Sequence, residues 1–258
     1  MRVGRFTGAP LHPARSSQIP TSPCHIVTPK SVTITNLKPG HFVLRNHPWE
    51  SHFALMGPNR VQTLIWSDET KINRLGSNGR KWVWKKPGEG LSDRLVQGTV
   101  KFGGGSVMIW GCMTWEGVGY ASKIDGRMDG NLCLQILKDK LLNSLQYYGL
   151  NSSDIIFQQD NDPKHICKKV KEWLEEQDFE TMVWPAQSPD LNPIEHLWGY
   201  LKRRLAEYEH PPNGILQLWE RIQEVWEGIP VEECQKLIES MPRRVQAVVR
   251  AKGGYTKY

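Results

Sequence analysis

The sequence predicts an α/β domain in which a mixed sheet is flanked by helices and followed by a helical C-terminal tail. Short apolar runs of strand length recur between residues 61 and 124. From residue 130 onward, segments with apolar residues at helical spacing alternate with two more short runs, and after residue 190 only helical patterns remain. A chain of 258 residues supports one large domain, or one domain with an appendage.

The first elements are three predicted strands. Residues 61–68 form an apolar run that predicts a buried strand ending at Asp68, and the runs at 107–113 and 119–124 predict two more. Residues 70–105 between them are polar, basic and rich in glycine. The glycines at 103–105 precede a strand and lack a following Gly-Lys-Ser/Thr, so we interpret them as a flexible joint and not as a phosphate-binding loop.

The later elements are mostly helices. Residues 130–148 predict a helix, 155–157 a strand, and Asp162-Pro163 opens another helix as N-cap and first helical residue. A short strand at 181–184 precedes helices beginning at Asn192-Pro193 and covering 214–227 and 230–248. This order favours a ribonuclease-H-like fold. A doubly wound nucleotide-binding sheet would require strict alternation of strands and helices.

The N-terminal segment differs in composition from the rest. Residues 1–50 contain seven prolines, and residues 1–49 contain six basic residues and no acid, although the whole chain has a net charge of +6. We therefore divide the chain into a Pro-rich, basic and largely disordered segment, 1–59, and a catalytic domain, 60–258. Residues 31–36 could form a short strand. A basic, acid-free segment favours polyanions, and a solvated tail is an equally good interpretation.

Three acids are candidates for a metal site: Asp68, Asp160 and Glu195, the last two separated by 34 residues. Carboxylates are the natural ligands of two divalent ions such as Mg²⁺, and two-ion sites cut and join phosphodiesters. Each acid also has a structural interpretation. Asp68 could start a turn. If Asp162 caps a helix, Asp160 is left without a structural task. Glu195 and Asn192 match a capping box, worth about 1 kcal/mol.

Four phrases resemble the catalytic domain of Tc/mariner transposases over about residues 60–258. They are Trp66-Ser-Asp68-Glu, Lys101-Phe-Gly-Gly-Gly-Ser-Val-Met-Ile-Trp-Gly111, Gln158-Gln-Asp160-Asn-Asp-Pro-Lys-His165 and Ser188-Pro-Asp-Leu-Asn-Pro-Ile-Glu195-His-Leu-Trp198. The resemblance implies a ribonuclease-H-like fold and cut-and-paste DNA transposition and integration in the nucleus. It also implies two Mg²⁺ or Mn²⁺ ions held by Asp68, Asp160 and Glu195. The implied partners are double-stranded DNA and a second copy of the chain, with no membrane.

Basic residues are candidates for DNA contact. Some lie in the loop that resembles the family's insertion, where Trp82 and Trp84 are interleaved with bases; others lie near the acids. The candidates are Arg80, Lys81, Lys85, Lys86, His165, Lys202, Arg203 and Arg204. The tail residues Arg243, Arg244, Arg250 and Lys252 could also neutralise phosphates. Ordinary solvated helix faces, and for His165 a polar contact at a helix start, remain alternatives.

The sequence departs from the family before the first acid. Tc/mariner transposases carry a helix-turn-helix region there, and residues 1–50 show no helical periodicity of that kind. Two hypotheses follow from the sequence. The chain is an active metal-dependent DNA endonuclease and strand-transferase, or a truncated, catalytically idle transposon-derived protein that at most binds DNA or a related transposase subunit.

Overall fold

The computed structural model describes residues 58–75, 104–185, 188–252, 254 and 256–258. The predictions for residues 1–57, including disorder up to residue 30 and a strand at 31–36, lie outside the described residues. So do the candidate DNA-binding residues Arg80, Lys81, Lys85 and Lys86.

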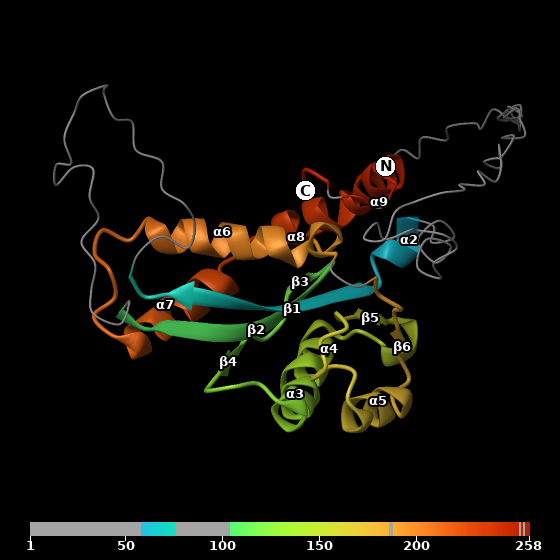
Figure 1. Cartoon of the computed structure of the whole chain (residues 1–258), viewed down its shortest axis with the longest axis horizontal. Helices are drawn as coiled ribbons and strands as arrows, with labels where there is room; N and C mark the ends of the chain where they lie inside the picture. The colour runs from blue at the N-terminus through green and yellow to red at the C-terminus, as the bar shows by residue number, and fades with distance from the viewer. Residues whose placement is uncertain (1–57, 76–103, 186–187, 253, 255) are drawn as a thin grey trace, which may run out of the picture. The chain divides into compact units, whose positions relative to one another are not determined.

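The central strand of the sheet is β1, Leu64–Asn73. It pairs antiparallel with β2, Ser106–Thr114, and parallel with β5, Ile156–Gln158. Two short strands, β3 (Gly117–Val118) and β4 (Ser122–Ile124), pair with β2, and β6 (Glu180–Thr181) pairs with β5. The order β3-β2-β1-β5-β6 makes a mixed sheet, as the sequence predicts (Figure 1).

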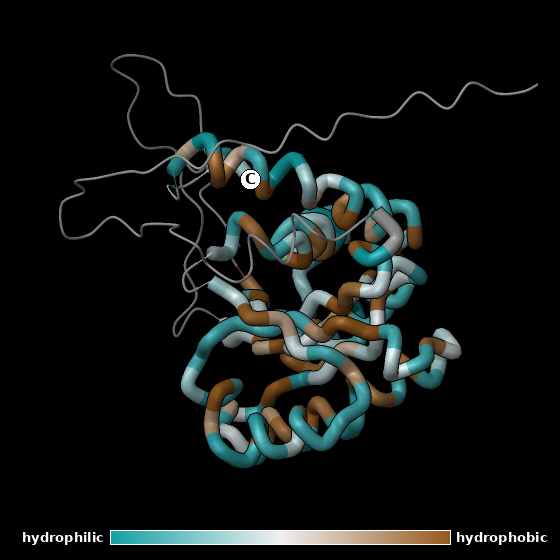
Figure 2. The backbone as a smooth tube through the Cα atoms, turned by 90° about the vertical axis from the view of Figure 1, so that its right-hand side faces the viewer, coloured by the Kyte–Doolittle hydropathy of each residue, from teal (hydrophilic) through white to brown (hydrophobic). Residues whose placement is uncertain are grey.

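Helices cover both faces of this sheet. Successive side chains of β1 point to opposite faces, so the strand contributes to a core on each face. Trp66 and Ile72 pack toward α6 (Ile194–Ala206), α7 (Ile215–Glu227), α8 (Val231–Glu239) and α9 (Met241–Arg250). Ile65 packs into a second core with α3 (Gly130–Ile136), η2 (Leu137–Leu141), α4 (Leu142–Tyr148) and α5 (Lys168–Glu175). Figure 2 shows hydrophobic segments concentrated between these layers.

Several strand predictions need correction. β1 does not end at Asp68; it continues to Asn73 because β2 keeps pairing with it as far as Ser106. The strand predicted at 119–124 is β4 alone, and the one predicted at 181–184 is the two-residue β6. Gly104 and Gly105 have φ of 73° and 84°, a backbone that favours glycine, so at these two positions the predicted flexible joint has a defined conformation.

The helical predictions are closer, but one predicted helix is divided in two. Residues 130–148 form one continuous run through α3, η2 and α4, and Gly149 ends it with φ of 62°. The helix predicted over 230–248 is two helices, since α9 begins anew at Met241, followed by Pro242, which has no N–H. The short turns α2 (Pro58–Val61), η3 (Ser152–Asp154) and η4 (Pro189–Leu191) complete the described elements. No described helix has the length and apolar character needed to cross a membrane.

Candidate active site

Asp68 lies in the middle of β1, at the level where the neighbouring strand β5 ends. Its partner on β2 is Gly111, whereas the pairing with β5 stops two residues earlier, at Trp66 and Gln158. The chain leaves the sheet after Gln158, and Asp160 follows two residues later. The end of β5 therefore brings Asp160 to the same part of the sheet as Asp68.

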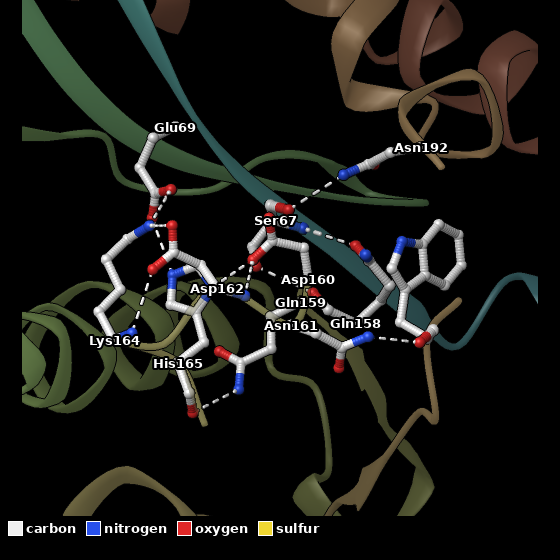
Figure 3. Close-up of polar contacts among 11 residues, drawn as sticks. Ser67, Glu69, Gln158, Gln159, Asp160, Asn161, Asp162, Lys164, His165 and Asn192 are labelled. Carbon is white, nitrogen blue, oxygen red and sulfur yellow. Dashed lines mark hydrogen bonds and ion pairs between the residues drawn. The ribbon is translucent and has the colours of Figure 1, made fainter. Parts of the chain in front are cut away.

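Ser67 connects three segments beside Asp68. Its hydroxyl donates to the Gln158 carbonyl over 2.9 Å, and its own carbonyl accepts from Asn192 Nδ2 over 3.2 Å. All three residues are buried. Because Asn192 lies just before α6, these bonds hold β1, the end of β5 and the start of α6 together (Figure 3). A buried polar contact of this kind fixes relative position, since breaking it leaves an unsatisfied group.

Glu195 lies in the first turn of α6, and the capping-box interpretation of this residue is wrong. The N–H of Asn192 bonds to the Pro189 carbonyl at 3.1 Å, and the side chain of Asn192 is directed to β1. The N-cap position, Pro193, has no side-chain cap. Glu195 is exposed, next to the buried Ile194 on the same turn. Glu195 therefore lies at the edge of the buried face of α6, as its place beside the apolar stripe predicts.

The pKa of Asp68 depends on its burial and on the acids around it. Burial raises the pKa of Asp68 to about 8, and the charge of Glu195 is the next largest cause, with smaller contributions from Glu69 and Asp160. Like charges near a carboxylate disfavour its ionised form. Asp68, Asp160 and Glu195, from a strand, a strand end and a helix, therefore lie near enough for the charges of the other two to act on Asp68.

Asp160 has structural partners, contrary to the sequence interpretation. Its Oδ1 accepts from His165 Nδ1 at 2.6 Å and from the Asp162 N–H at 3.0 Å. Burial would raise the pKa of Asp160, but these hydrogen bonds outweigh it and hold the pKa below its usual value. Asp162 does not cap α5, which begins at Lys168; it accepts from the Lys164 N–H in a tight turn. The expected helix start is a turn that orients Asp160.

Glu69 is the residue of this site that the sequence analysis missed. Its Oε1 lies 3.0 Å from His165 Nε2, and its Oε2 lies 3.2 Å from Lys164 Nζ (Figure 3). Burial would lower the pKa of His165, but its bonds to Asp160 and Glu69 raise the pKa to about 9. The strand alternation could have found Glu69, since it faces away from Asp68 toward the turn at 162–165.

The basic candidates divide by their surroundings. His165 is only 4% exposed and bonds to the carboxylates of Asp160 and Glu69, which is the polar contact expected as the alternative to DNA contact. Lys202 lies on α6 and donates to Thr70 Oγ1 over 2.8 Å. Arg203 is exposed and lines a groove of about 680 Å³ with Glu195. Arg204 forms an exposed ion pair with Glu207.

Of the tail residues, Arg244 is buried and serves the fold. Its guanidinium donates to Ser240 Oγ at 2.8 Å and to the Asp190 carbonyl at 3.2 Å, and it lies over the ring of Tyr258. Arg243 and Arg250 are exposed on α9, and Lys252 follows that helix. Phosphate contact by Arg244 would need this set of bonds to break.

The carboxylates fit divalent cations by their chemistry. Hard oxygen donors suit Mg²⁺ and Mn²⁺, and a cation would offset both the burial and the nearby negative charge that raise the pKa of Asp68. In the described part of the chain, no three His, Cys, Asp or Glu side chains are gathered closely enough to hold an ion as they stand. Rotation of the exposed Glu195 side chain toward Asp68 would bring these two acids nearer, while Asp160 keeps its bonds to His165 and to the Asp162 N–H.

The mixed sheet with helices on both faces defines a ribonuclease-H-like domain, and Asp68, Asp160 and Glu195 are its candidate acids. Comparison with known proteins agrees. The family described as DDE superfamily endonuclease matches residues 63–214. The chain is 43% identical over 211 residues to the Tc1 transposase of Caenorhabditis elegans, covering 81% of this chain and 76% of the relative. It is 39% identical over 212 residues to the Tcb1 transposase of Caenorhabditis briggsae, with the same coverage.

Solved structures support the fold. The Mos1 mariner paired end complex with Mn superposes with a TM-score of 0.68 at 22% identity, over 81% of this chain and 61% of that chain. This superposition shows the ribonuclease-H-like architecture that the element order predicts, and at 22% identity it shows the fold alone. Together with the family match and the identity to the Tc1 and Tcb1 transposases, the chain belongs to the DDE superfamily endonucleases of the Tc/mariner transposase group.

Proposed function

We propose that this chain is the catalytic part of a transposase that cleaves DNA strands and transfers them in cut-and-paste transposition, with Asp68, Asp160 and Glu195 as the acids of its active site. The observation that supports the proposal is that the three segments carrying these acids, β1, the end of β5 and the start of α6, are joined by the buried Ser67–Gln158 and Asn192–Ser67 hydrogen bonds. Membership of the DDE superfamily endonucleases supports it.

Asp68, Asp160 and Glu195 would hold two divalent ions, Mg²⁺ or Mn²⁺. Bound there, such ions activate an attacking water or 3′-hydroxyl and stabilise the leaving oxygen. The protein's own part is geometry. Ser67 and Asn192 fix the start of α6 against β1, and His165 orients Asp160. Pre-positioned groups lower a barrier because they need no reorganisation during the reaction.

Lys202 and Arg203 are the described bases best suited to hold the DNA backbone. Lys202 lies two turns beyond Glu195 on α6, and its ammonium contacts the neutral Thr70 hydroxyl. Arg203 shares a groove with Glu195. Both can neutralise phosphates beside the acids. We also propose that two copies act together on paired DNA ends, in the nucleus, where genomic DNA lies; the paired end complex described for Mos1 supports the first part.

The test is strand cleavage and transfer by the purified chain, using duplex DNA that carries the terminal repeats of its own element, in Mg²⁺ or Mn²⁺. Asp68→Asn, Asp160→Asn and Glu195→Gln should each reduce product by at least ~100-fold while folding and DNA binding persist. Glu172→Gln, which changes an exposed surface ion pair on α5, is the matched control and should act as wild type. Equal product from wild type and Asp160→Asn would contradict the assignment. A folded wild type that binds DNA without any product would support the idle alternative.

A further inference from the structure

We propose that Glu69, acting through His165, is a positioning residue that sets the orientation of Asp160 for metal binding. The inference rests on the proposed role of Asp160 and adds a residue outside the three acids. It starts from a chain of contacts, Glu69 Oε1 to His165 Nε2 at 3.0 Å and His165 Nδ1 to Asp160 Oδ1 at 2.6 Å (Figure 3).

The imidazole of His165 cannot turn without losing one of these contacts, because both ring nitrogens are used. Its side chain is 4% exposed, that of Glu69 is 12% exposed, and that of Asp160 is 51% exposed. The inner end of the chain of contacts is thus held by packing, and the outer end faces solvent. Glu69 therefore fixes the orientation of the His165 ring, and the ring fixes the orientation of the Asp160 carboxylate.

Both carboxylate oxygens of Glu69 already have partners. Its second oxygen, Oε2, pairs with Lys164 Nζ at 3.2 Å, and the same ammonium pairs with Asp162 at 2.9 Å. With both oxygens engaged, and facing away from Asp68 across β1, Glu69 is not a fourth ligand. Because Glu69 follows Asp68 on β1, this one strand fixes the positions of two acids, Asp68 and Asp160. Asp68 belongs to β1 directly, and Asp160 is tied to it through His165.

Hydrogen-bond partners behind metal ligands commonly change metal affinity by about 10–100-fold when removed. Glu69→Gln should weaken Mn²⁺ binding to the full chain by that factor, measured by the electron paramagnetic resonance of free Mn²⁺ during titration. DNA binding should not change. Saturating Mn²⁺ should restore most of the maximal rate, because the ligand itself is still present. Glu172→Gln is again the control with an unchanged affinity.

Two substitutions of His165 separate positioning from general packing. Asn can reproduce the Nδ1 donor that faces Asp160, whereas Gln can reproduce the Nε2 contact with Glu69. Mn²⁺ affinity should therefore fall in the order wild type, His165→Asn, His165→Gln, and the reverse order would overturn the inference. In the His165→Gln background, adding Glu69→Gln should have little further effect, since the route to Asp160 is already cut.

A metal-free measurement completes the test. The N–H groups of Asp162, His165 and Ile166 are bonded within this turn, so their hydrogen exchange should accelerate in Glu69→Gln and not in Glu172→Gln. Unchanged exchange together with wild-type Mn²⁺ affinity would overturn the proposal. If Asp160→Asn lost activity and Glu69→Gln bound Mn²⁺ as wild type, only this inference would fail. If Asp160→Asn remained active, the proposed function would fail first.

Discussion

Gly111 pairs with Asp68 across the β1–β2 ladder, and adding a methyl group there tests how the site is supported. A Cβ at Gly111 would lie 2.8 Å from Trp198 Cη2 and 3.0 Å from Trp226 Cζ2. Carbon atoms in contact prefer about 3.5–4.0 Å, so the rings would have to retreat by roughly 1 Å. Both tryptophans are buried and stacked at 4.9 Å, and Trp226 Nε1 is bonded to the Gly119 carbonyl. Movement of either ring would therefore disturb this stacking and packing.

Gly111→Ala should therefore lower the free energy of unfolding by about 1–3 kcal/mol, the usual cost of overpacking. For a domain of this size that corresponds to a Tm lower by roughly 2–12 °C, measured by calorimetry or circular dichroism. Because Trp198 lies one turn after Glu195 on α6, activity should fall more than stability alone accounts for.

The same substitution at Gly199 is the matched control. This glycine lies inside α6, and a Cβ there would meet only the end of the Arg203 side chain, at 3.4 Å. Gly199→Ala should stabilise the protein by about 0.5–1 kcal/mol through helix propensity. Adding Trp198→Phe to Gly111→Ala should cost less than the sum of the two separate changes. A Gly111→Ala variant that unfolds at the wild-type temperature would refute the reasoning.

Three further predictions concern the site. Asn192→Ala should lower the free energy of unfolding by about 1–3 kcal/mol in urea titration, because it leaves the buried Ser67 carbonyl without its donor; an unchanged midpoint would contradict the role of this bond. Lys202→Met should weaken DNA binding and reduce the slope of log K against log salt by about 1, measured by fluorescence anisotropy, whereas an unchanged slope would exclude a phosphate contact. In chelator, Asp68→Asn should be more stable than wild type, by a margin that widens from about pH 4 to pH 8. The folded pKa of Asp68 is raised to about 8, so its ionisation destabilises the fold increasingly as pH rises, and a margin independent of pH would contradict this.

The fold was accessible from the sequence because apolar periodicity reports burial. Most of the α6 stripe and the apolar runs of β1, β2 and β5 lie in the core of the structure, as do Ile222 and Trp226 of α7, whereas Leu216 of the α7 stripe is exposed. The limits of these elements were less accessible. The polar residues after Asp68 suggested a strand end, but Thr70 and Ile72 continue on the α6 side of β1 while Lys71 faces solvent. Where one face of a strand is exposed, the sequence is no longer continuously apolar although the hydrogen bonding to the neighbouring strand continues.

Site residues show the same division between local and distant causes. Asp162-Pro163 has the composition of a helix start, and the same residues suit a tight turn, so only the distant partner of His165 decides between them. That partner, Glu69, lies on β1, 96 positions earlier in the sequence, so nothing in the residues around Asp162 reveals it. The capping-box pattern of Asn192 and Glu195 failed for a similar reason. The amide nitrogen of Asn192 donates to a buried carbonyl on β1, and its oxygen accepts from the Ile194 N–H and not from that of Glu195.

The position of Asp68 within β1 explains how like charges can be kept together in a folded protein. On the β2 side the ladder runs unbroken past Asp68 to Asn73, so the backbone that carries the acid is fixed in both directions. On the β5 side the ladder ends two residues earlier, at Trp66 and Gln158, and Asp160 follows that end. Burial raises the pKa of Asp68 most, and the charge of Glu195 adds to it; that repulsion acts on side chains and not on the pairing of the strands. A site built in this way can bring its carboxylates closer when a cation is present without disturbing the sheet, because the bonds that hold the sheet do not involve them.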